Sequence, residues 1–404
     1  MLFRSAEALA RGIRDAGVNV IDVNRVTTPM VYFATHHLGT HSGVAVTGSH
    51  NPPDYNGLKM VLGGETLAGE AIQMLRRRIE NNNYTHGSGS FTSQEVAHAY
   101  VERIASDVKL ARPLKIVVDC GNGVAGAFAP ELYRRLGCEV IELFCEVDGT
   151  FPNHHPDPSV PDNLRDVRNA LRDSDAALGL AFDGDGDRLG VVTKRGEIIY
   201  PDRQLMLFAK DVLARNAGGT VIYDVKSTRN LKPWIERHGG RPLLWKTGHS
   251  FIKAKLAETG ALLAGEMSGH VFFKERWYGF DDALYAGARL LEILSKVPDL
   301  TSALENLPDA VSTPELHVQT AEGENYTLMD ALKRDAKFGS AKEIITIDGV
   351  RVEYADGFGL ARPSNTTPVI VLRFEADNEA AIQRIQADFR KALNQVKPGI
   401  ALPF

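Results

Sequence analysis

The sequence predicts a multidomain α/β protein with three similar α/β units, each built on a mixed sheet, and a last unit of α+β type. Its 404 residues are too many for one compact core and suit two to four domains. Up to about residue 310, short apolar strands alternate with amphipathic helices, which is the pattern of α/β sheets. Beyond that point strands dominate and one long helix closes the chain, which is typical of an α+β unit.

The first predicted unit, residues 1–94, opens with an amphipathic helix and ends in a polar linker. Its expected elements are a helix at 1–17, a strand at 18–23, a helix at 30–38, a strand that starts at 42 and runs into a loop, the segment 56–61, and a helix at 68–80. The Asn- and Gly-rich stretch 81–90 predicts a connection to the next domain.

Three further units follow, at 95–197, 198–309 and 310–404. The second unit is expected to hold helices at 95–108, 127–137 and 164–174, strands at 114–120 and 139–144, and two apolar runs around an acidic loop within 176–193. The third is expected to hold helices at 203–216, 227–239 and 250–260 and strands at 219–225, 241–246 and 261–266. The last is expected to hold strands at 315–320, 343–355 and 368–376 and a helix at 379–396.

The composition argues against several classes of partner. A net charge of -5 provides no basic field for nucleic acid or for anionic lipid. No apolar run approaches the roughly 18 residues of a membrane span, and the first segment reads as a helix rather than a signal peptide. The three cysteines lack metal-type spacing and favour a reducing compartment. We therefore expect a cytoplasmic protein with neither nucleic-acid nor membrane partners.

The acidic loop "DGDGDR" is the strongest chemical signal in the chain. It places Asp183, Asp185 and Asp187 at alternate positions after a buried strand, with glycines that let the carboxylates turn toward one point. Three like charges converge at acceptable cost when a cation neutralises them, and all-oxygen ligands favour Mg²⁺ or Ca²⁺ over zinc. An EF-hand is disfavoured because Arg188 and Lys194 stand where that loop needs glycine and glutamate. A surface turn remains the alternative, and Arg188 beside the carboxylates indicates a nearby phosphate.

The stretch "VAVTGSHNPP" places Ser49 on a turn at the end of a strand. Pro52 and Pro53 stop further strand pairing, so the turn is stiff. No G-x-S-x-G elbow is present, which disfavours acyl transfer. A phosphorylated serine facing Mg²⁺ fits better, because a phosphoryl oxygen would fill a coordination position that the aspartates leave open. His50 and Lys59 could balance phosphate charge or move a proton, although an ordinary turn and a solvated lysine are the alternatives.

Two other loops offer groups for a sugar phosphate. "GEMSGH" presents Glu266 and Ser268 between apolar strands, and these suit vicinal sugar hydroxyls, with a plain hairpin turn as the alternative. "RPSNTTP" gathers side chains that fit a phosphate which does not react, although a turn is an equal reading. Its candidate residues are Arg362, Ser364, Asn365 and Thr366.

Lys226 and His249 complete the candidates. Lys226 stands in "DVKST" at the end of a predicted strand, and His249 stands in "KTGHS" just before a predicted helix. A phosphate at that helix N-terminus is plausible, while the Thr and Ser of the motif could simply be helix caps.

Together, "TGSHNP", "DGDGDR", "GEMSGH" and "RPSNTTP" resemble, in order and spacing, the motifs of the α-D-phosphohexomutase family. The resemblance runs from Met1 to Phe404 and is nearest to the bacterial branch that acts on both mannose and glucose phosphates. It implies four domains around a central active-site cleft. It also implies roles for several candidates: Ser49 carries the phosphoryl group; Asp183, Asp185 and Asp187 bind Mg²⁺ with it; His249 lies near the reacting group; Lys59 is the general base; Glu266, Ser268, Arg362, Ser364, Asn365 and Thr366 bind the substrate. From the residues themselves we expect His50 and Arg188 to act beside the phosphate and Lys226 to bind the substrate.

The reaction implied by the resemblance is a reversible phosphoryl transfer between C1 and C6 of a hexose phosphate. Phosphoserine would donate its phosphoryl group, the bisphosphorylated sugar would turn end over end, and the serine would take back the other group. Glucose 1,6-bisphosphate is the expected activator, Mg²⁺ the expected cofactor, and a monomer the expected assembly. A site that reads the 3- and 4-hydroxyls would accept glucose and mannose alike.

Two features keep alternatives open. Phosphoglucosamine mutases are similar but usually have Gln where this chain has Met267. Family members also begin with an extra segment that adds a first strand and a Tyr- and Arg-containing stretch, whereas this sequence starts at a predicted helix. We therefore expect either a longer natural protein or a weakly active or non-catalytic form that binds sugar phosphates.

Overall fold

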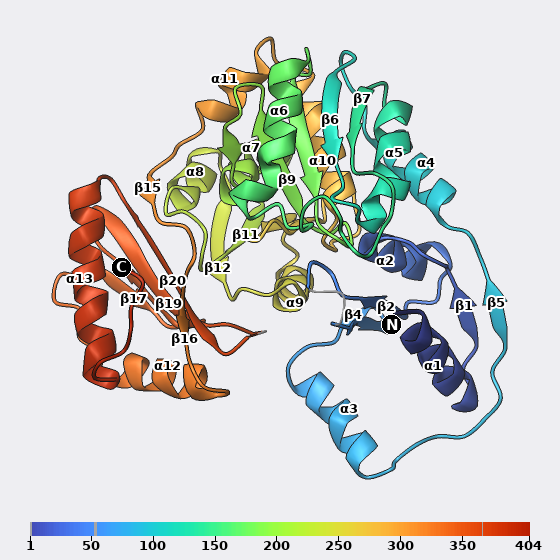
Figure 1. The fold of residues 1–404 in the computed structure, drawn as a ribbon, viewed down its shortest axis with the longest axis horizontal. Coiled ribbons are helices and arrows are strands. Elements are labelled where there is room, and N and C mark those ends of the chain that lie inside the picture. Colours follow the sequence, from blue (N-terminus) through green and yellow to red (C-terminus); the bar gives the residue numbers. More distant parts are fainter. Residues whose placement is uncertain (1, 52–54, 366) are drawn as a thin grey trace.

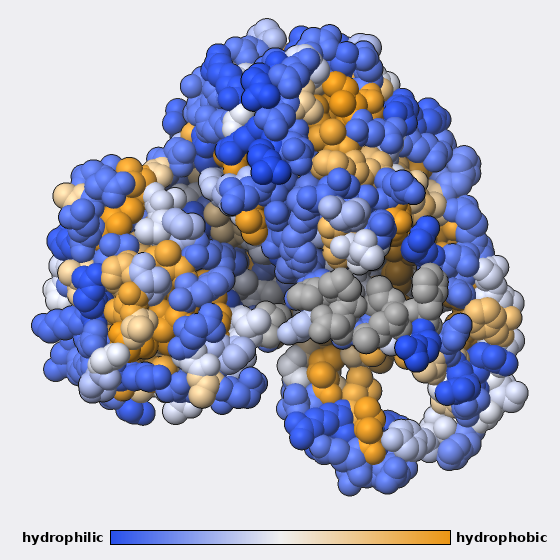
Figure 2. Space-filling view, viewed as in Figure 1, coloured by the Kyte–Doolittle hydropathy of each residue, from blue (hydrophilic) through white to orange (hydrophobic). Residues whose placement is uncertain are grey.

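The computed structural model describes residues 2–51, 55–365 and 367–404, with side chains from residue 4 onward (Figure 1). Three α/β units and a C-terminal α+β unit are present, in agreement with the predicted fold class. The second and third units lie side by side at the top of Figure 1, the C-terminal unit at the left and the first unit at the lower right. Figure 2 shows the surface hollowed between the C-terminal and first units. In the described part of the chain, no helix combines the length and apolarity that a bilayer crossing requires.

The second unit is built on a five-stranded mixed sheet in the order β10-β9-β8-β6-β7. Strands β6, β7 and β8 are parallel, and β9 and β10 are antiparallel to their neighbours. Alternate residues of β6 face opposite cores: Val117 packs toward α6, while Ile116 and Val118 face the main core with Tyr133 of α5. The elements are α4 (Ala97–Asp107), β6 (Lys115–Asp119), η1 (Val124–Ala127), α5 (Ala129–Arg135), β7 (Glu139–Leu143), η2 (Pro161–Leu164), α6 (Arg165–Asp173), β8 (Leu178–Phe182), β9 (Leu189–Thr193) and β10 (Ile198–Ile199).

The third unit holds a four-stranded sheet in the order β12-β11-β13-β14, with α9 packed on one face. Every residue of α10 is buried, and Asp282 caps this helix by accepting the Tyr285 N–H. Buried α10 side chains share one core with residues of the second unit, which joins the two units. The elements are α7 (Pro201–Arg215), β11 (Thr220–Asp224), α8 (Leu231–Arg237), β12 (Arg241–Trp245), α9 (His249–Thr259), β13 (Leu263–Gly265), β14 (Val271–Phe273), α10 (Ala283–Leu294) and α11 (Leu300–Glu305).

The first unit differs from the other two because its strands form two separate sheets. β1 pairs in parallel with β5, while β2, β3 and β4 form an antiparallel sheet. Helix α2 docks this unit on the others: Phe33 packs against Tyr100 and Trp277. Apolar side chains remain exposed along α3, where Met74 and Ile79 are 57% and 60% exposed, and Figure 2 shows an opening beside this helix. The elements are α1 (Leu2–Asp15), β1 (Val20–Asp22), α2 (Thr28–His37), β2 (Gly43–Thr47), β3 (Gly57–Leu62), β4 (Glu65–Thr66), α3 (Glu70–Glu80) and β5 (Phe91–Ser93).

The C-terminal unit packs α12 and α13 on an antiparallel sheet with its own core. Arg351 anchors the unit to the third: its guanidinium stacks on Phe358 and donates to the carbonyls of Val225 and Ser227, at 2.6 and 2.7 Å. The elements are β15 (Val311–Ser312), β16 (Leu316–Gln319), α12 (Glu324–Asp335), β17 (Glu343–Ile345), β18 (Val350–Glu353), β19 (Gly357–Pro363), β20 (Val369–Ala376) and α13 (Glu379–Val396).

Some boundaries differ from the sequence prediction for local reasons. The helix predicted at 30–38 begins at Thr28, because the Thr27 side chain caps it and Pro29 suits its first turn. The helix predicted at 227–239 is shorter, because Ser227 and Thr228 donate to Asp224 and Glu375 and lie before α8. Helices α10 and α12 and strand β19 were not predicted.

Candidate active site

Ser49 lies two residues beyond the end of β2, in a strained backbone conformation. Its φ is 51°, a left-handed value that is uncommon for a residue with a side chain. The Ser49 N–H donates to the hydroxyl of Thr47 at 2.8 Å, which holds the turn. The turn therefore fixes the direction of the Ser49 hydroxyl.

The three aspartates lie in the tight loop between β8 and β9 and meet the Ser49 hydroxyl across the boundary between the first two units. Ser49 Oγ lies 3.2 Å from Asp183 Oδ2 and 3.1 Å from Asp185 Oδ1. A Cβ at Gly184 would lie 2.2 Å from the carbonyl oxygen of Ser49, so only glycine allows this approach of the two backbones. Asp183, Asp185 and Asp187 are all buried, and each offers a carboxylate oxygen within 4.8 Å of the others.

Local hydrogen bonds orient these carboxylates. Asp183 Oδ1 accepts the backbone N–H groups of Asp187 and Arg188, at 3.0 and 3.1 Å. Asp185 Oδ2 accepts the hydroxyls of Thr28 and Thr47, at 2.7 and 3.0 Å. The first unit thus contributes two hydroxyls to a carboxylate of the second unit. The sequence did not single out Thr28, whose partner is 157 positions away.

Lys59 supplies a positive charge to this acidic group from β3. Its Nζ lies 2.8 Å from Asp185 Oδ2 and 2.5 Å from Asp187 Oδ2. Burial alone would lower the pKa of Lys59, but the two carboxylates outweigh it and raise the pKa well above its ordinary value. Burial alone would raise the pKa of Asp185, but the charge of Lys59 outweighs burial and lowers this pKa below its ordinary value. Asp183 lies 4.0 Å from Arg188 Nε, but burial and the charges of Asp187 and Asp185 outweigh this cation and raise its pKa well above the ordinary value.

His50 contacts the Ser49 hydroxyl together with the two aspartates. Its Nδ1 lies 3.1 Å from Ser49 Oγ, and its carbonyl oxygen contacts Nε2 of His155. Burial and then the charge of Arg188 lower the pKa of His50 to about 4. The ring is therefore neutral at pH 7, and its Nδ1 can accept a hydrogen bond from the Ser49 hydroxyl.

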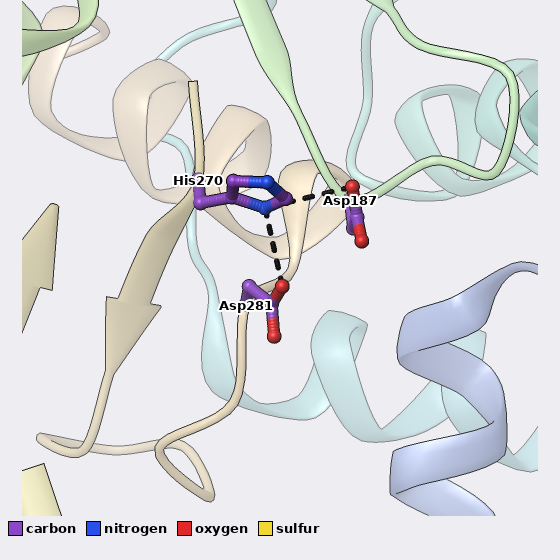
Figure 3. A group of neighbouring side chains, drawn as sticks. All are labelled: Asp187, His270 and Asp281. Atoms are coloured by element: carbon purple, nitrogen blue, oxygen red, sulfur yellow. Dashed lines mark ion pairs between the residues drawn. The ribbon is translucent and has the colours of Figure 1, made fainter. Parts of the chain in front are cut away.

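A second cluster adjoins the acidic group on its far side (Figure 3). His270 lies between Asp187 and Asp281, with Nδ1 at 3.5 and 3.1 Å from their carboxylates. Because Arg188 Nε donates to His270 Nε2 at 3.1 Å, the ring proton belongs on Nδ1, facing the carboxylates. Nδ1 lies at ion-pair distance from the two carboxylates without a hydrogen bond among the described residues, and the bond from Arg188 to Nε2 makes His270 a support for Arg188.

His249, at the start of α9, reaches the acidic group only through this second cluster. It stacks on His270 at 5.6 Å and lies 3.6 Å from Asp281. Lys253 lies 2.8 Å from Asp281 and 3.1 Å from His249 Nδ1. Burial and then Lys253 lower the pKa of His249 well below its ordinary value. His270, Asp281 and Lys253 were absent from the sequence prediction, although His270 stands within the "GEMSGH" motif.

Glu266 and Ser268 lie on the turn between β13 and β14. The carboxylate of Glu266 is buried and accepts the N–H of Gly248, and burial raises its pKa. Ser268 is partly exposed. The Met267 N–H donates to Asp224 at 3.2 Å, which ties the turn to the end of β11.

The "RPSNTTP" segment continues β19 into a loop that faces the third unit. Arg362 Nε donates to Asp348 at 2.9 Å, and Asn365 Nδ2 donates to the carbonyl of Thr247 at 3.2 Å. The Nη2 atom of Arg362 is buried and has no hydrogen-bond partner among the described residues, so it is available to an anion. Ser364 follows Arg362 in the same loop, and the predicted Thr366 lies outside the described residues. Lys226 pairs with Glu315 at 2.6 Å.

Comparison with known families accounts for this architecture. Models described as phosphoglucomutase/phosphomannomutase alpha/beta/alpha domains I, II and III match residues 4–86, 98–196 and 200–311, and the model of the C-terminal domain matches 315–392. The chain belongs to the phosphoglucomutase/phosphomannomutase family. The predicted family, fold class and enzyme class, a phosphohexomutase of the isomerase type, are confirmed.

Individual family members are similar over nearly the whole chain. A phosphoglucomutase of Neisseria gonorrhoeae is 60% identical over 400 residues, which cover 98% of this chain and 87% of the relative. A phosphomannomutase/phosphoglucomutase of Pseudomonas putida is 58% identical over 402 residues, 98% of this chain and 86% of the relative. The crystal structure of a family protein from Burkholderia thailandensis superposes with a TM-score of 0.93 at 61% identity and covers 99% of this chain and 88% of that chain.

The acidic group of this family member fits a divalent metal ion. Its candidate donors are all oxygens, which is the set that hard divalent cations prefer. Asp187 Oδ1 is buried without a hydrogen-bond partner in the described part of the chain, so a ligand position is available. Asp183, Asp185 and Asp187 are therefore the residues that would hold the ion.

Proposed function

We propose that the protein interconverts the 1- and 6-phosphates of glucose and mannose through a phosphorylated Ser49. The observation that carries the proposal is the position of Ser49 Oγ, 3.2 and 3.1 Å from two buried aspartates. A strained turn directs this hydroxyl into a group of carboxylates that needs a cation. Such an arrangement suits a residue that holds a transferable phosphoryl group beside a metal ion.

The chain's own residues supply the groups that the transfer needs. Ser49 Oγ forms a bond to phosphorus of a bisphosphorylated hexose, and the bond from phosphorus to the sugar oxygen breaks. The proton of Ser49 passes to neutral His50, and the sugar oxygen takes up a proton as it leaves. In the opposite direction the phosphoserine donates: a hydroxyl of a hexose monophosphate forms a bond to its phosphorus, the bond from phosphorus to Ser49 Oγ breaks, and the hydroxyl proton ends on Ser49 Oγ. The bisphosphorylated sugar then turns over, and Ser49 takes the other phosphoryl group, which regenerates the phosphoserine. Glucose 1,6-bisphosphate is accordingly the activator that loads Ser49.

The charges around Ser49 suit the transferring group. Mg²⁺ held by Asp183, Asp185 and Asp187 would offset the charge that phosphoryl transfer spreads over the phosphate oxygens. Arg188, whose Nε lies 4.0 Å from Asp183, adds a second positive charge, and His270 orients it. The raised pKa keeps Lys59 protonated beside Asp185 and Asp187, so the base role predicted for it requires that the ammonium leave these carboxylates and lose its proton.

The remaining loops suit the two ends of the substrate. Glu266 and Ser268 offer acceptors for the 3- and 4-hydroxyls, which occupy similar places in both orientations of the sugar. Arg362, with Ser364, Asn365 and Thr366, would hold the phosphate that does not react, and the unpaired Nη2 of Arg362 supports this assignment. Lys226 would complete the substrate contacts, and His249 would lie near the reacting group.

The test is turnover of glucose 1-phosphate and mannose 1-phosphate with Mg²⁺ and glucose 1,6-bisphosphate. The wild-type protein should turn over both sugars, and Ser49→Ala should remove activity on both. Ser106→Ala, which changes an exposed serine on α4, is the matched control and should keep wild-type turnover. Equal activity of Ser49→Ala and wild type would overturn the proposal. Faster turnover of glucosamine 6-phosphate than of mannose 6-phosphate would assign the protein to the glucosamine branch instead.

A further inference from the structure

Two thiols outside the proposed site meet at the ends of neighbouring strands. Cys120 directly follows β6, and Cys145 comes two residues after β7, which pairs in parallel with β6. Their Sγ atoms are 3.7 Å apart. Neighbouring strands lie about 4.8 Å apart, within the separations that a disulfide can bridge. A bond of about 2.05 Å therefore requires the sulfurs to approach by about 1.6 Å.

The two thiols differ in their exposure to solvent, which decides the one that an oxidant reaches first. Cys145 is partly exposed, so an oxidant in solution can reach it. Cys120 is buried, and burial raises the pKa of its thiol well above the ordinary value. Cys145 is thus the thiol that meets the oxidant first. Cys120, whose sulfur lies 3.7 Å away, is placed to attack the product, and its raised pKa makes this second step the slower one because only the thiolate attacks.

Backbone contacts connect the thiols to Ser49. A Cβ at Gly126 would lie 2.2 Å from the carbonyl oxygen of Cys145. A Cβ at Gly123 would lie 2.9 Å from Gly184 Cα, and Gly184 in turn touches the backbone of Ser49. Hydrogen bonds fix the same path, because Gly123 N–H donates to Cys120 O at 2.6 Å and Val124 N–H donates to Gly184 O at 3.0 Å. These approaches join backbone to backbone, so a displacement at the thiols is passed to the acidic loop.

We propose that Cys120 and Cys145 form a peroxide-sensitive pair whose disulfide slows the mutase. Cys145 sulfur attacks one oxygen of a hydroperoxide, the O–O bond breaks, and sulfenic acid and water (or an alcohol) form. Cys120 sulfur then attacks the sulfenic sulfur, and a second water leaves as the S–S bond forms. Two thiols are oxidised while one peroxide is reduced. The effect on activity rests on the proposed function, whereas the formation of the disulfide does not.

The test treats the intact protein with hydrogen peroxide and maps its disulfides. Free thiols are alkylated, and the protein is digested with trypsin and a glutamate-specific protease, which separates Cys138 from Cys145 by cutting after Glu139 or Glu142. Mass spectrometry should find the peptide of Cys120 linked to the peptide of Cys145. A displacement of about 1 Å at a reaction centre can cost about a hundredfold in rate, so we expect kcat to fall at least about tenfold and to recover with dithiothreitol.

Variants separate this mechanism from general oxidation. Cys145→Ser and Cys120→Ala should each keep their activity in peroxide, and Cys138→Ser, the control, should lose activity as the wild type does. Absence of the 120–145 link, a Cys145 that stops at sulfenic or sulfinic acid, or a linked protein with unchanged kcat would each overturn the inference. A reduced protein without mutase activity would refute the proposed function, and the link alone would then decide whether the pair exists.

Discussion

The Lys59→Met variant tests how the charges of the site stabilise the contact between the first and second units. Lys59 belongs to the first unit, and its partners Asp185 and Asp187 belong to the second. Its side chain is 16% exposed, and those of the aspartates are 7% and 0% exposed. The substitution keeps most of the aliphatic volume and leaves the buried carboxylates without their cation. We therefore expect it to loosen the docking of the first unit on the second.

The expected cost follows from the burial of this ion pair. Removing one partner of a buried pair costs about 3–5 kcal/mol, because the other charge stays buried and unpaired. An exposed pair contributes about 0–1 kcal/mol. Lys397→Met is the matched control, since Lys397 is 37% exposed in its pair with Glu324. In a chelator, Lys59→Met should thus lose several times more unfolding free energy than Lys397→Met.

A divalent cation should reverse much of that loss. In the wild type the Lys59 ammonium repels a cation bound by the aspartates. Two unit charges about 4 Å apart interact by about 4 kcal/mol at an effective dielectric constant of 20, and the double charge of Mg²⁺ doubles this repulsion. Even a small part of that repulsion, about 1.4 kcal/mol, makes Mg²⁺ bind about tenfold more tightly to Lys59→Met than to wild type. At a hundred times its Kd, the ion adds about 2.7 kcal/mol of stability.

The assay is urea unfolding followed by tryptophan fluorescence, in chelator and in saturating Mg²⁺. Trp277 is a suitable reporter because it stacks on Phe33 of the first unit. Calorimetric Mg²⁺ titration of each variant measures the affinity. A Lys59→Met protein that unfolds at the wild-type urea concentration in chelator and binds Mg²⁺ with wild-type affinity would refute this reasoning.

Three further variants probe geometry, recognition and pH dependence. Gly184→Ala places a Cβ 2.2 Å from Ser49 O. It should lower the unfolding free energy by about 1–3 kcal/mol and kcat by more than tenfold. Gly149→Ala, the control with open space around it, should behave as wild type in the same melting and turnover assays. Glu266→Gln should lower kcat/KM about a hundredfold, equally for glucose and mannose 1-phosphates, because a charged hydrogen bond contributes about 1.5–3 kcal/mol and both sugars share the hydroxyls it binds; loss on one sugar alone would refute the shared contact. Burial raises the pKa of Asp282 from 3.8 to about 7. The folded state therefore holds an extra proton between these values, and its stability should fall by up to about 4 kcal/mol as pH rises through this range. Asp282→Asn should show a flatter pH dependence of the melting temperature, and identical profiles for variant and wild type would disprove the assignment.

The sequence predicted the fold class because its periodicities are local. Apolar runs marked β6, β8 and β9, and the acidic loop followed directly from its place after β8. Helix α10 was not predicted, and its burial on every side, Arg289 and Glu292 included, depends on the packing of the second and third units and could not be read from its own sequence. Helix α12 and strand β19 stand in the C-terminal unit, where the order of elements no longer followed the α/β alternation.

The site was predictable where single motifs carry it. Ser49 and the three aspartates stand in short motifs of unusual composition, and in the structure Ser49 Oγ lies within hydrogen-bond distance of Asp183 and Asp185. Contacts between segments that are distant in the sequence could not be predicted from any single motif. The hydroxyl of Thr28 on Asp185 and the pairing of Lys59 with the acidic loop depend on how the first unit docks on the second.

The most direct test of the account is the site of phosphorylation. The protein is incubated with Mg²⁺ and glucose 1,6-bisphosphate labelled with ³²P, digested with trypsin, and sequenced by mass spectrometry. We predict label on the peptide that contains Ser49, at that residue, and its transfer to unlabelled hexose phosphate in a chase. A protein that turns over hexose phosphates while its label lies on another residue, or that keeps the label on Ser49 through the chase, would contradict the account.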